Sequence, residues 1–330
     1  MQLDSSYLHL DASFTGLTSF FGGYSGVFNV VDSKVADSNP IIAAYVQEHK
    51  DTTFLLEATE KTKTMTTVEA VCNFLIAKHA DRKALVVGIG GGITTDIVGF
   101  AAAIYKRGVA CGYVPTTVLG AVDAAVGGKS GVNVGELKNM LGAIRQPKFV
   151  FFCPALWESI PDEVAAEGWA ELVKMQIIRN LNVLTAKYVN RGASPSEAAI
   201  FAAARAKLDI VEADETEQNL RRILNLGHTY AHAIEALSSG AVSHGNAVSI
   251  GLVLSAETSV RLGICKSPGI VEVIKKKLLS YGLPVDCPYS KPDMLAAICN
   301  DKKMEGGKIH FIAIRNLFDV VDVLIEPELL

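Results

Sequence analysis

One stretch of the sequence, ALVVGIGGGITTD at residues 84–96, constrains the fold more than any other. Residues 84–89 form a nearly continuous apolar run, which is typical of a strand buried on both faces. Gly90, Gly91 and Gly92 follow directly, and residues 93–108 then have the apolar spacing of a helix that Gly108 ends. A strand, a tight glycine turn and a helix in this order predict one repeat of a parallel α/β sheet.

Similar patterns alternate through the first half of the chain. Strands are predicted at residues 26–32, 52–58, 111–117 and 148–154, and a further helix at 66–80. From Pro161 onward the periodicity is helical, over residues 161–179, 194–213, 228–237, 246–262 and 267–281, before a small hairpin at 308–314 and 318–325. With 330 residues, the chain is predicted to have an α/β fold with a parallel-sheet domain at 1–155 and a mainly helical domain at 156–330.

Composition limits the class of partner. The formal net charge is −4, which disfavours general binding to nucleic acid or to a membrane surface. None of the six cysteines forms a CxxC pair, so we interpret them as reduced thiols. Neither a signal peptide nor an apolar stretch long enough to span a membrane is apparent, and we therefore expect a cytoplasmic protein.

The glycine turn at residues 90–92 is also a candidate nucleotide site. Glycine lets a phosphate approach the backbone closely, and the N-terminus of the following helix favours negative charge. Thr95 stands where the usual GxGxxG pattern has a packing glycine or alanine. A tight turn that binds no ligand is the alternative interpretation.

The segment VDAAVGGKSGVNVGELKNMLG, residues 122–142, places charged side chains among small ones. Asp123, Lys129, Lys138 and Asn139 stand between glycines, alanines and valines. Small residues around a lysine favour close backbone packing beside a cleft, where an ammonium group can bind a phosphate or carboxylate. The alternative is a flexible loop with ordinary surface lysines.

Histidines gather in the second half. His228 and His232 are four residues apart on a predicted helix and therefore share a face, and His244 follows within 17 residues. With Glu171 they provide the imidazole and carboxylate groups that zinc binds. Arg221 and Asn225 lie just upstream and would extend the stripe if the helix continued, which predicts an anionic substrate. Structural or surface histidines are the alternative.

These motifs resemble the 3-dehydroquinate synthase family, within the sugar-phosphate cyclases, over about residues 54–315. The blocks that carry the resemblance are GGGITTDIVGF, YKRG, VPTTVLGAVDAAVGGKSGVN, LKNMLGAIRQP, GWAELVK, RRILNLGHTYAHAIE, HGNAV and DKKMEGGKIHF. The resemblance implies a Rossmann-like first domain, NAD, Zn²⁺ or Co²⁺, and conversion of 3-deoxy-D-arabino-heptulosonate 7-phosphate to 3-dehydroquinate and phosphate.

The resemblance also implies residue roles. Glu171, His228 and His244 would bind the metal, His232 the substrate phosphate, and Arg107 of YKRG a phosphate across a homodimer interface. The implied substrate set is Asp123, Lys129, Lys138, Asn139, Lys174, Lys207, Arg221, Asn225 and Lys302. The implied NAD set is Asp32, Glu60, Lys63, Gly91, Gly92, Asp96, Thr116 and Thr117, together with Asp123, Lys129, Lys138 and Ser159.

Alternatives within the same chemistry stay open. A cyclase of the 2-epi-5-epi-valiolone or 2-deoxy-scyllo-inosose synthase type would act on a sugar phosphate without a carboxylate, which Lys207 and Arg221 disfavour. A metal-dependent polyol dehydrogenase would not need Lys129, Lys138 and Asn139. The chain departs from the family pattern at Lys34, Thr95, Ser159, Ala231 and Asn246.

Overall fold

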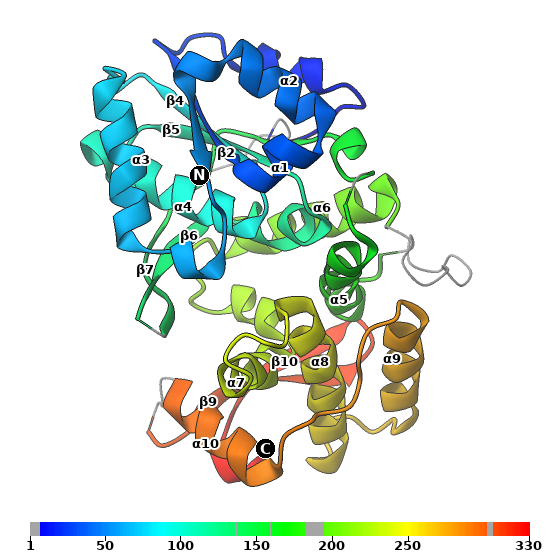
Figure 1. The fold of residues 1–330 in the computed structure, drawn as a ribbon. Helices are drawn as coiled ribbons and strands as arrows, with labels where there is room; N and C mark the ends of the chain where they lie inside the picture. Colours follow the sequence, from blue (N-terminus) through cyan, green and yellow to red (C-terminus); the bar gives the residue numbers. More distant parts are fainter. Residues whose placement is uncertain (1–6, 136, 159, 182–194, 302–305) are drawn as a thin grey trace. The chain divides into compact units, whose positions relative to one another are not determined.

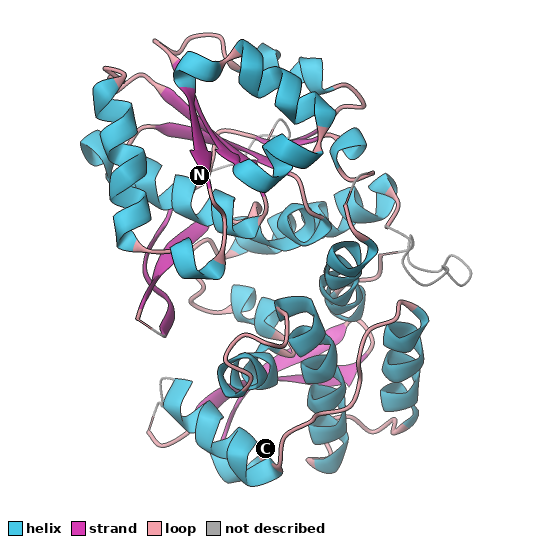
Figure 2. Cartoon of the chain, in the orientation of Figure 1, coloured by secondary structure: helices cyan, strands magenta, loops and turns pink. Residues whose placement is uncertain are grey.

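The computed structural model describes residues 7–135, 137–158, 160–181, 195–301 and 306–330. The chain divides into two compact units, Met1–Pro161 and Asp162–Leu330, each with its own core. Figure 1 follows the chain through both units, and Figure 2 shows that the larger sheet belongs to the first of them.

A six-stranded parallel sheet forms the centre of the first unit, with the strand order β1-β8-β5-β4-β2-β3. Val30, Val86, Val87 and Ile89 from its central strands are fully buried, as their apolar runs predict. The strands are β1 (Leu8–Leu10), β2 (Val27–Asp32), β3 (Thr53–Leu56), β4 (Leu85–Gly90), β5 (Ala110–Pro115) and β8 (Val150–Phe152).

Helices and one antiparallel hairpin complete the first unit. Helix α4 packs against β4, β5 and β2, and α3 packs against α4. The helices are α1 (Ser33–Ser38), α2 (Pro40–Glu48), α3 (Met65–Ala77) and α4 (Gly92–Ile104), and the hairpin pairs β6 (Lys129–Val134) with β7 (Leu137–Ile144).

The second unit is mainly helical. Helix α8 is buried over most of its surface and packs against α5, α7, α9 and β9. Its elements are α5 (Asp162–Ile178), α6 (Glu197–Ala213), α7 (His228–Leu237), α8 (His244–Arg261), α9 (Gly269–Ser280), α10 (Lys291–Asp301) and the antiparallel strands β9 (Ile309–Asn316) and β10 (Asp319–Ile325). The predicted α/β class with a helical second half is confirmed. None of the described helices is both long and apolar enough to cross a membrane.

Two local predictions need correction. The helix expected at residues 93–108 ends at Ile104, and a short 3-10 turn, η4 (Tyr105–Arg107), follows it with Lys106 and Arg107 at positive φ. The stripe of Arg221, Asn225 and His228 depended on a helix that continues through all three residues. A 3-10 turn, η8 (Leu220–Asn225), instead ends before Gly227, whose φ of 83° breaks the helix and restarts it as α7.

Candidate functional site

The second unit brings together the three predicted metal ligands. Glu171 lies within α5, whereas His228 and His244 are the first residues of α7 and α8. The Nε2 atoms of His228 and His244 lie 3.6 and 3.5 Å from Oε1 of Glu171, and one ligand atom from each residue lies within 4.8 Å of the others. The ligand set implied by the family resemblance is thus compact in three dimensions.

Glycines allow the three helices to approach closely enough for this cluster. A Cβ atom on Gly245, in the first turn of α8, would lie 2.5 Å from the backbone of Glu167 in α5. A Cβ on Gly251 would collide with the carbonyl oxygen of Gly227, just before α7. Larger side chains at these positions would force α5, α7 and α8 apart and separate the ligand atoms.

Hydrogen bonds orient the ligand groups. Nδ1 of His228 lies 3.1 Å from the carbonyl oxygen of Leu226, so an Nδ1–H group donates there and the lone pair that can bind an ion is on Nε2. Nδ1 of His244 faces Oε1 of Glu235 at 3.5 Å. Burial lowers the pKa of His244, but the carboxylates of Glu171 and Glu235 outweigh burial and raise that pKa to about 10. The cluster therefore attracts positive charge.

The donor set fits a divalent metal. Both carboxylate oxygens of Glu171 are buried, and Lys174 forms an ion pair with Oε2. Ligands at 2.0–2.2 Å in a tetrahedron lie about 3.4 Å from one another. The observed separations of 3.5 and 3.6 Å are close to that value.

Three predicted substrate-binding cations are buried on neighbouring elements. Lys174 lies on α5, Lys207 on α6 and Arg221 on η8, and these three elements pack against one another. The backbone N–H of Arg221 donates to Oδ2 of Asp214 at 3.0 Å, and its guanidinium donates to the Glu215 carbonyl oxygen at 2.5 Å. Burying a cation is costly unless it is paired, so several at one place are typical of anion binding.

His232, which is predicted to bind the substrate phosphate, lies near the same cluster. The ring of His232 is 5.5 Å from that of His228. The Asn225 amide donates to Oε1 of Glu217 at 2.7 Å, and Glu217 has a positive φ of 59°. Glu217 and Glu235 were not among the predicted site residues, because a glutamate in an acidic stretch or on a helix carries no distinguishing pattern in the sequence.

Predicted NAD-binding residues follow the carboxyl ends of four adjacent strands in the first unit. Strands β5, β4, β2 and β3 are neighbours in that order. In α/β sheets, ligands bind outside the carboxyl ends of the strands, at the point where the strand order reverses. Asp32 ends β2 and caps α1, and burial raises its pKa. The others are Thr116 and Thr117 after β5, Gly91 and Gly92 after β4, and Glu60 and Lys63 after β3.

Asp96 and Lys63 form a buried ion pair beside the glycine turn. Lys63 Nζ lies 2.5 Å from Oδ2 of Asp96 and donates to Oδ1 of Asn139 at 2.6 Å. Burial raises the pKa of Asp96 to about 6, although the Lys63 ammonium lowers it. The structure thus joins two predicted NAD-binding residues to one predicted substrate-binding residue.

The remaining predicted residues of the first unit are more spread out. Asp123 lies in a π-helical turn, Gly120–Ala124. Lys129 begins β6 opposite Ile144, whereas Lys138 lies near the turn, so the hairpin holds the two lysines toward opposite ends. Arg107 is exposed at the positive-φ turn. Ser159 and Lys302 lie outside the described residues.

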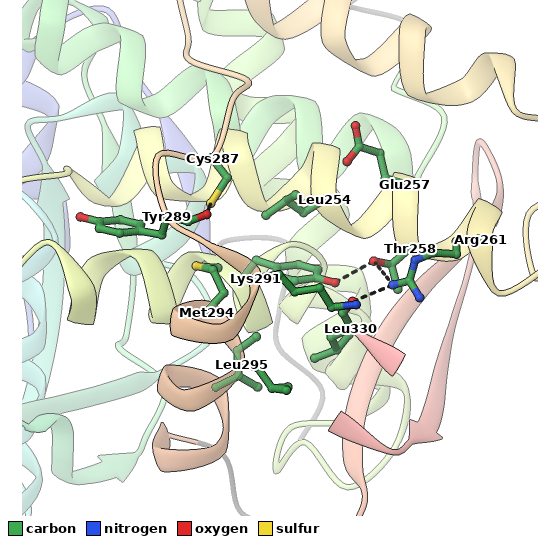
Figure 3. Close-up of a pocket in the computed structure, with 12 residues that line it drawn as sticks. Leu254, Glu257, Thr258, Arg261, Cys287, Tyr289, Lys291, Met294, Leu295 and Leu330 are labelled. Carbon is green, nitrogen blue, oxygen red and sulfur yellow. Dashed lines mark hydrogen bonds between the residues drawn. The ribbon is translucent and has the colours of Figure 1, made fainter. Parts of the chain in front are cut away.

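A cavity of about 240 Å³ in the second unit contains none of the predicted site residues (Figure 3). Tyr230 lines it and lies two residues from both His228 and His232, about 200° around α7. The cavity therefore opens on the other side of that helix. Its polar groups bond one another, since Thr258 Oγ1 lies 2.7 Å from the Tyr230 hydroxyl and 3.3 Å from Nη2 of Arg261.

Solved structures share the fold. A 2-epi-5-epi-valiolone synthase from Streptomyces hygroscopicus, with NAD⁺ and Zn²⁺ bound, has a TM-score of 0.85 and 26% identity. The alignment covers 100% of this chain and 95% of the synthase chain. A 2-deoxy-scyllo-inosose synthase complexed with carbaglucose-6-phosphate, NAD⁺ and Co²⁺ has a TM-score of 0.87 at 24% identity, with coverage of 98% and 94%.

Sequence comparison is more specific. The family profile for the 3-dehydroquinate synthase N-terminal region matches residues 53–167, and the profile for the C-terminal region matches residues 168–304. A 3-dehydroquinate synthase of Pyrococcus furiosus is 39% identical over 270 residues, which are 81% of this chain and 79% of the relative. On these matches, the chain belongs to the 3-dehydroquinate synthase family.

Proposed function

We propose that the chain converts 3-deoxy-D-arabino-heptulosonate 7-phosphate to 3-dehydroquinate and phosphate, with NAD⁺ and one divalent metal ion as cofactors. The observation that carries the proposal is the buried group of Lys174, Lys207 and Arg221, which lie on α5, the helix of Glu171, and on two elements that pack against α5. A doubly anionic substrate needs such charges, and a neutral polyol does not.

Glu171, His228 and His244 would hold the metal, as their donor atoms and separations fit. When bound, the ion supplies Lewis acidity toward a hydroxyl or ketone oxygen of the substrate. Lys174 lies against Glu171 and adds positive charge beside the ligand set. The Leu226 carbonyl and Glu235 hold the two imidazoles in the orientation that this ligation requires.

When bound, NAD⁺ would supply a hydride acceptor in a reaction without net oxidation. The residues at the carboxyl ends of β5, β4, β2 and β3 fit a dinucleotide. The N-terminus of α4 and the glycines before it suit a pyrophosphate, and a carboxylate such as Asp32 accepts hydrogen bonds from a ribose. Ser159, a further predicted contact, lies outside the described residues.

The side chains of the second unit would bind the two ends of the substrate. Arg221 and Lys207 would neutralise the carboxylate, and Arg221 offers a planar, bidentate donor. Asn225 and His232 would donate to the phosphate, where negative charge grows as the carbon–oxygen bond breaks. A phosphate oxygen would accept the proton that is lost in the elimination.

Lys129, Lys138 and Asn139 would contact the substrate from the first unit, and Asp123 would accept a hydrogen bond from one of its hydroxyls. Because the hairpin separates Lys129 from Lys138, we propose that they bind different parts of the bound molecules. Lys302 is a further proposed contact but lies outside the described residues.

A coupled assay tests the proposal. Purified protein would receive Zn²⁺, catalytic NAD⁺ and the seven-carbon acid phosphate, while phosphate release and NADH absorbance are followed together. We expect stoichiometric phosphate without accumulating NADH. Parallel reactions would contain sedoheptulose 7-phosphate or glucose 6-phosphate, neither of which has a carboxylate. Phosphate release that is equally fast or faster with one of these compounds would indicate that the enzyme's substrate carries no carboxylate. NADH accumulating with glycerol, and no phosphate released, would indicate a polyol dehydrogenase instead.

A further inference from the structure

Asn133 links two parts of the first unit that carry different predicted roles. It lies in β6, and its side-chain amide donates to Oε1 of Glu60 at 2.7 Å and more weakly to the Glu60 carbonyl oxygen at 3.4 Å. On its other side, Oδ1 of Asn133 accepts a hydrogen bond from the backbone N–H of Asn139 at 2.9 Å. One side chain therefore bonds to the loop after β3 and to β7.

The backbone of Asn133 strengthens the link. Its N–H group donates to the carbonyl oxygen of Lys63 at 2.9 Å, and an isolated parallel bridge pairs Asn133 with Thr64. Lys63 in turn donates from Nζ to Oδ1 of Asn139 at 2.6 Å. Asn133, Lys63 and Asn139 thus form a closed ring of contacts, and Lys63 also pairs with Asp96 beside the glycine turn.

The conformation of Asn139 explains why such a link is needed. Asn139 has a φ of 54°, a left-handed conformation that asparagine adopts more readily than most residues but that still costs some free energy. A strained residue persists only where neighbouring contacts hold it. The Asn139 N–H donates to Oδ1 of Asn133, and Oδ1 of Asn139 accepts a hydrogen bond from Lys63. These two hydrogen bonds supply that restraint.

We propose that Asn133 is a positioning residue that couples the NAD site to the substrate site, an inference that rests on the proposed function. Through its donor it holds Glu60 for the nucleotide, and through its acceptor it holds Asn139 for the substrate. Among uncharged side chains, a carboxamide supplies both a donor and an acceptor in one plane, and aspartate retains only the acceptor. In this role Asn133 would act through Glu60 and Asn139 and would not itself contact either ligand.

Two substitutions separate the two halves of this role. Asn133→Asp keeps the acceptor for Asn139 but loses the donor and sets a carboxylate against that of Glu60, whereas Asn133→Ala removes both bonds. Val134→Ala is the matched control, because Val134 is the next residue of β6, is exposed and lies outside the hydrogen-bonded ring.

NAD⁺ binding would be measured by titration calorimetry without substrate, and KM and kcat from phosphate release. We expect Asn133→Ala to weaken both the NAD⁺ Kd and the substrate KM roughly tenfold, and Asn133→Asp to weaken NAD⁺ binding roughly tenfold while KM stays within about twofold. Val134→Ala should match the wild type, and all three variants should keep its thermal transition within a few degrees.

If both Asn133 variants had the wild-type NAD⁺ Kd and substrate KM, Asn133 would not couple the two sites, and the proposed function would be unaffected. An equal shift of Kd and KM in Asn133→Asp and in Asn133→Ala would also overturn the coupling, since the donor and acceptor would then have no separate effects. A wild-type protein that binds no NAD⁺ and releases no phosphate would refute the proposed function and this inference with it.

Discussion

At the scale of single residues, Asp96 is a buried acidic side chain in a predicted ligand site, and its ionisation affects the stability of the fold. Its carboxyl group is largely buried beside Lys63, and burial raises its pKa from the ordinary value of 3.8 to about 6. Because the folded value lies above the unfolded one, the folded protein holds the proton more tightly than the unfolded chain. Asp96 therefore contributes stability below about pH 4, and this contribution is lost as pH rises through about 6.

We predict that Asp96→Asn stabilises the protein at neutral pH. The substitution mimics the protonated carboxyl group, and a difference of about two pKa units corresponds to roughly 3 kcal/mol in the free energy of unfolding. Urea unfolding at pH 8 should show a gain of up to about that size, which shrinks toward zero near pH 4, while NAD⁺ binding weakens. Equal stability of the two proteins at pH 8 would contradict the prediction.

Single residues also show how far the sequence predicts the site. Glu171, His228 and His244 were predictable because both histidines stand beside glycines and all three residues lie in blocks that resemble the 3-dehydroquinate synthase family. The structure brings the three residues together. Glu217 was missed because its role depends on the fold. Its carboxylate meets Asn225 only after a positive-φ turn bends the chain back, which no local pattern encodes.

At the scale of elements, some features are again predictable from a local sequence pattern and others depend on the fold. The strand β4 was predictable from its apolar run, since a strand buried on both faces leaves that pattern. The hairpin of β6 and β7 was not, because its eight-residue second strand is exposed along nearly its whole length and combines glycine, lysine and asparagine. Its pairing comes from backbone hydrogen bonds and from contacts with the loop after β3, which involve distant residues.

The packing of α5, α7 and α8 leads to a prediction about metal removal. One metal ligand comes from each helix, so an ion would bind the folded cluster and not the unfolded chain. At a free concentration 100 times its Kd, such a ligand stabilises the folded state by about 2.7 kcal/mol. We expect chelation to lower the unfolding temperature by roughly 4 °C, and added Zn²⁺ to restore it.

His244→Ala should abolish this dependence, because it removes one of three ligands from the cluster. His232→Ala is the matched control, since His232 lies on α7 near the cluster and is not among its three ligand residues. Elemental analysis should find about one zinc per chain in the wild type and in His232→Ala, and little in His244→Ala. Stoichiometric zinc in His244→Ala would contradict the ligand assignment.

At the scale of the whole molecule, Arg107 raises the question of a second copy. Three successive residues, Lys106, Arg107 and Gly108, have φ values of 48°, 65° and 115°, and both charged side chains are exposed. Left-handed conformations of residues other than glycine are costly, and they persist mostly at functional positions. The resemblance to the family implies that Arg107 binds a phosphate held by a neighbouring chain, and we propose that the exposed turn presents it there in a homodimer.

Mixing two inactive variants tests that arrangement. If each site needs Lys129 from one chain and Arg107 from the other, Arg107→Ala and Lys129→Ala are each inactive alone. A dimer of one variant with the other then has one site with both defects and one with neither. Random re-pairing makes half of the dimers mixed, so about one site in four becomes active. Phosphate release should rise to roughly a quarter of the wild-type rate, with sedimentation confirming dimers. A mixture no more active than its components would place Arg107 within its own chain's site, because sites built from a single chain cannot be repaired by exchange.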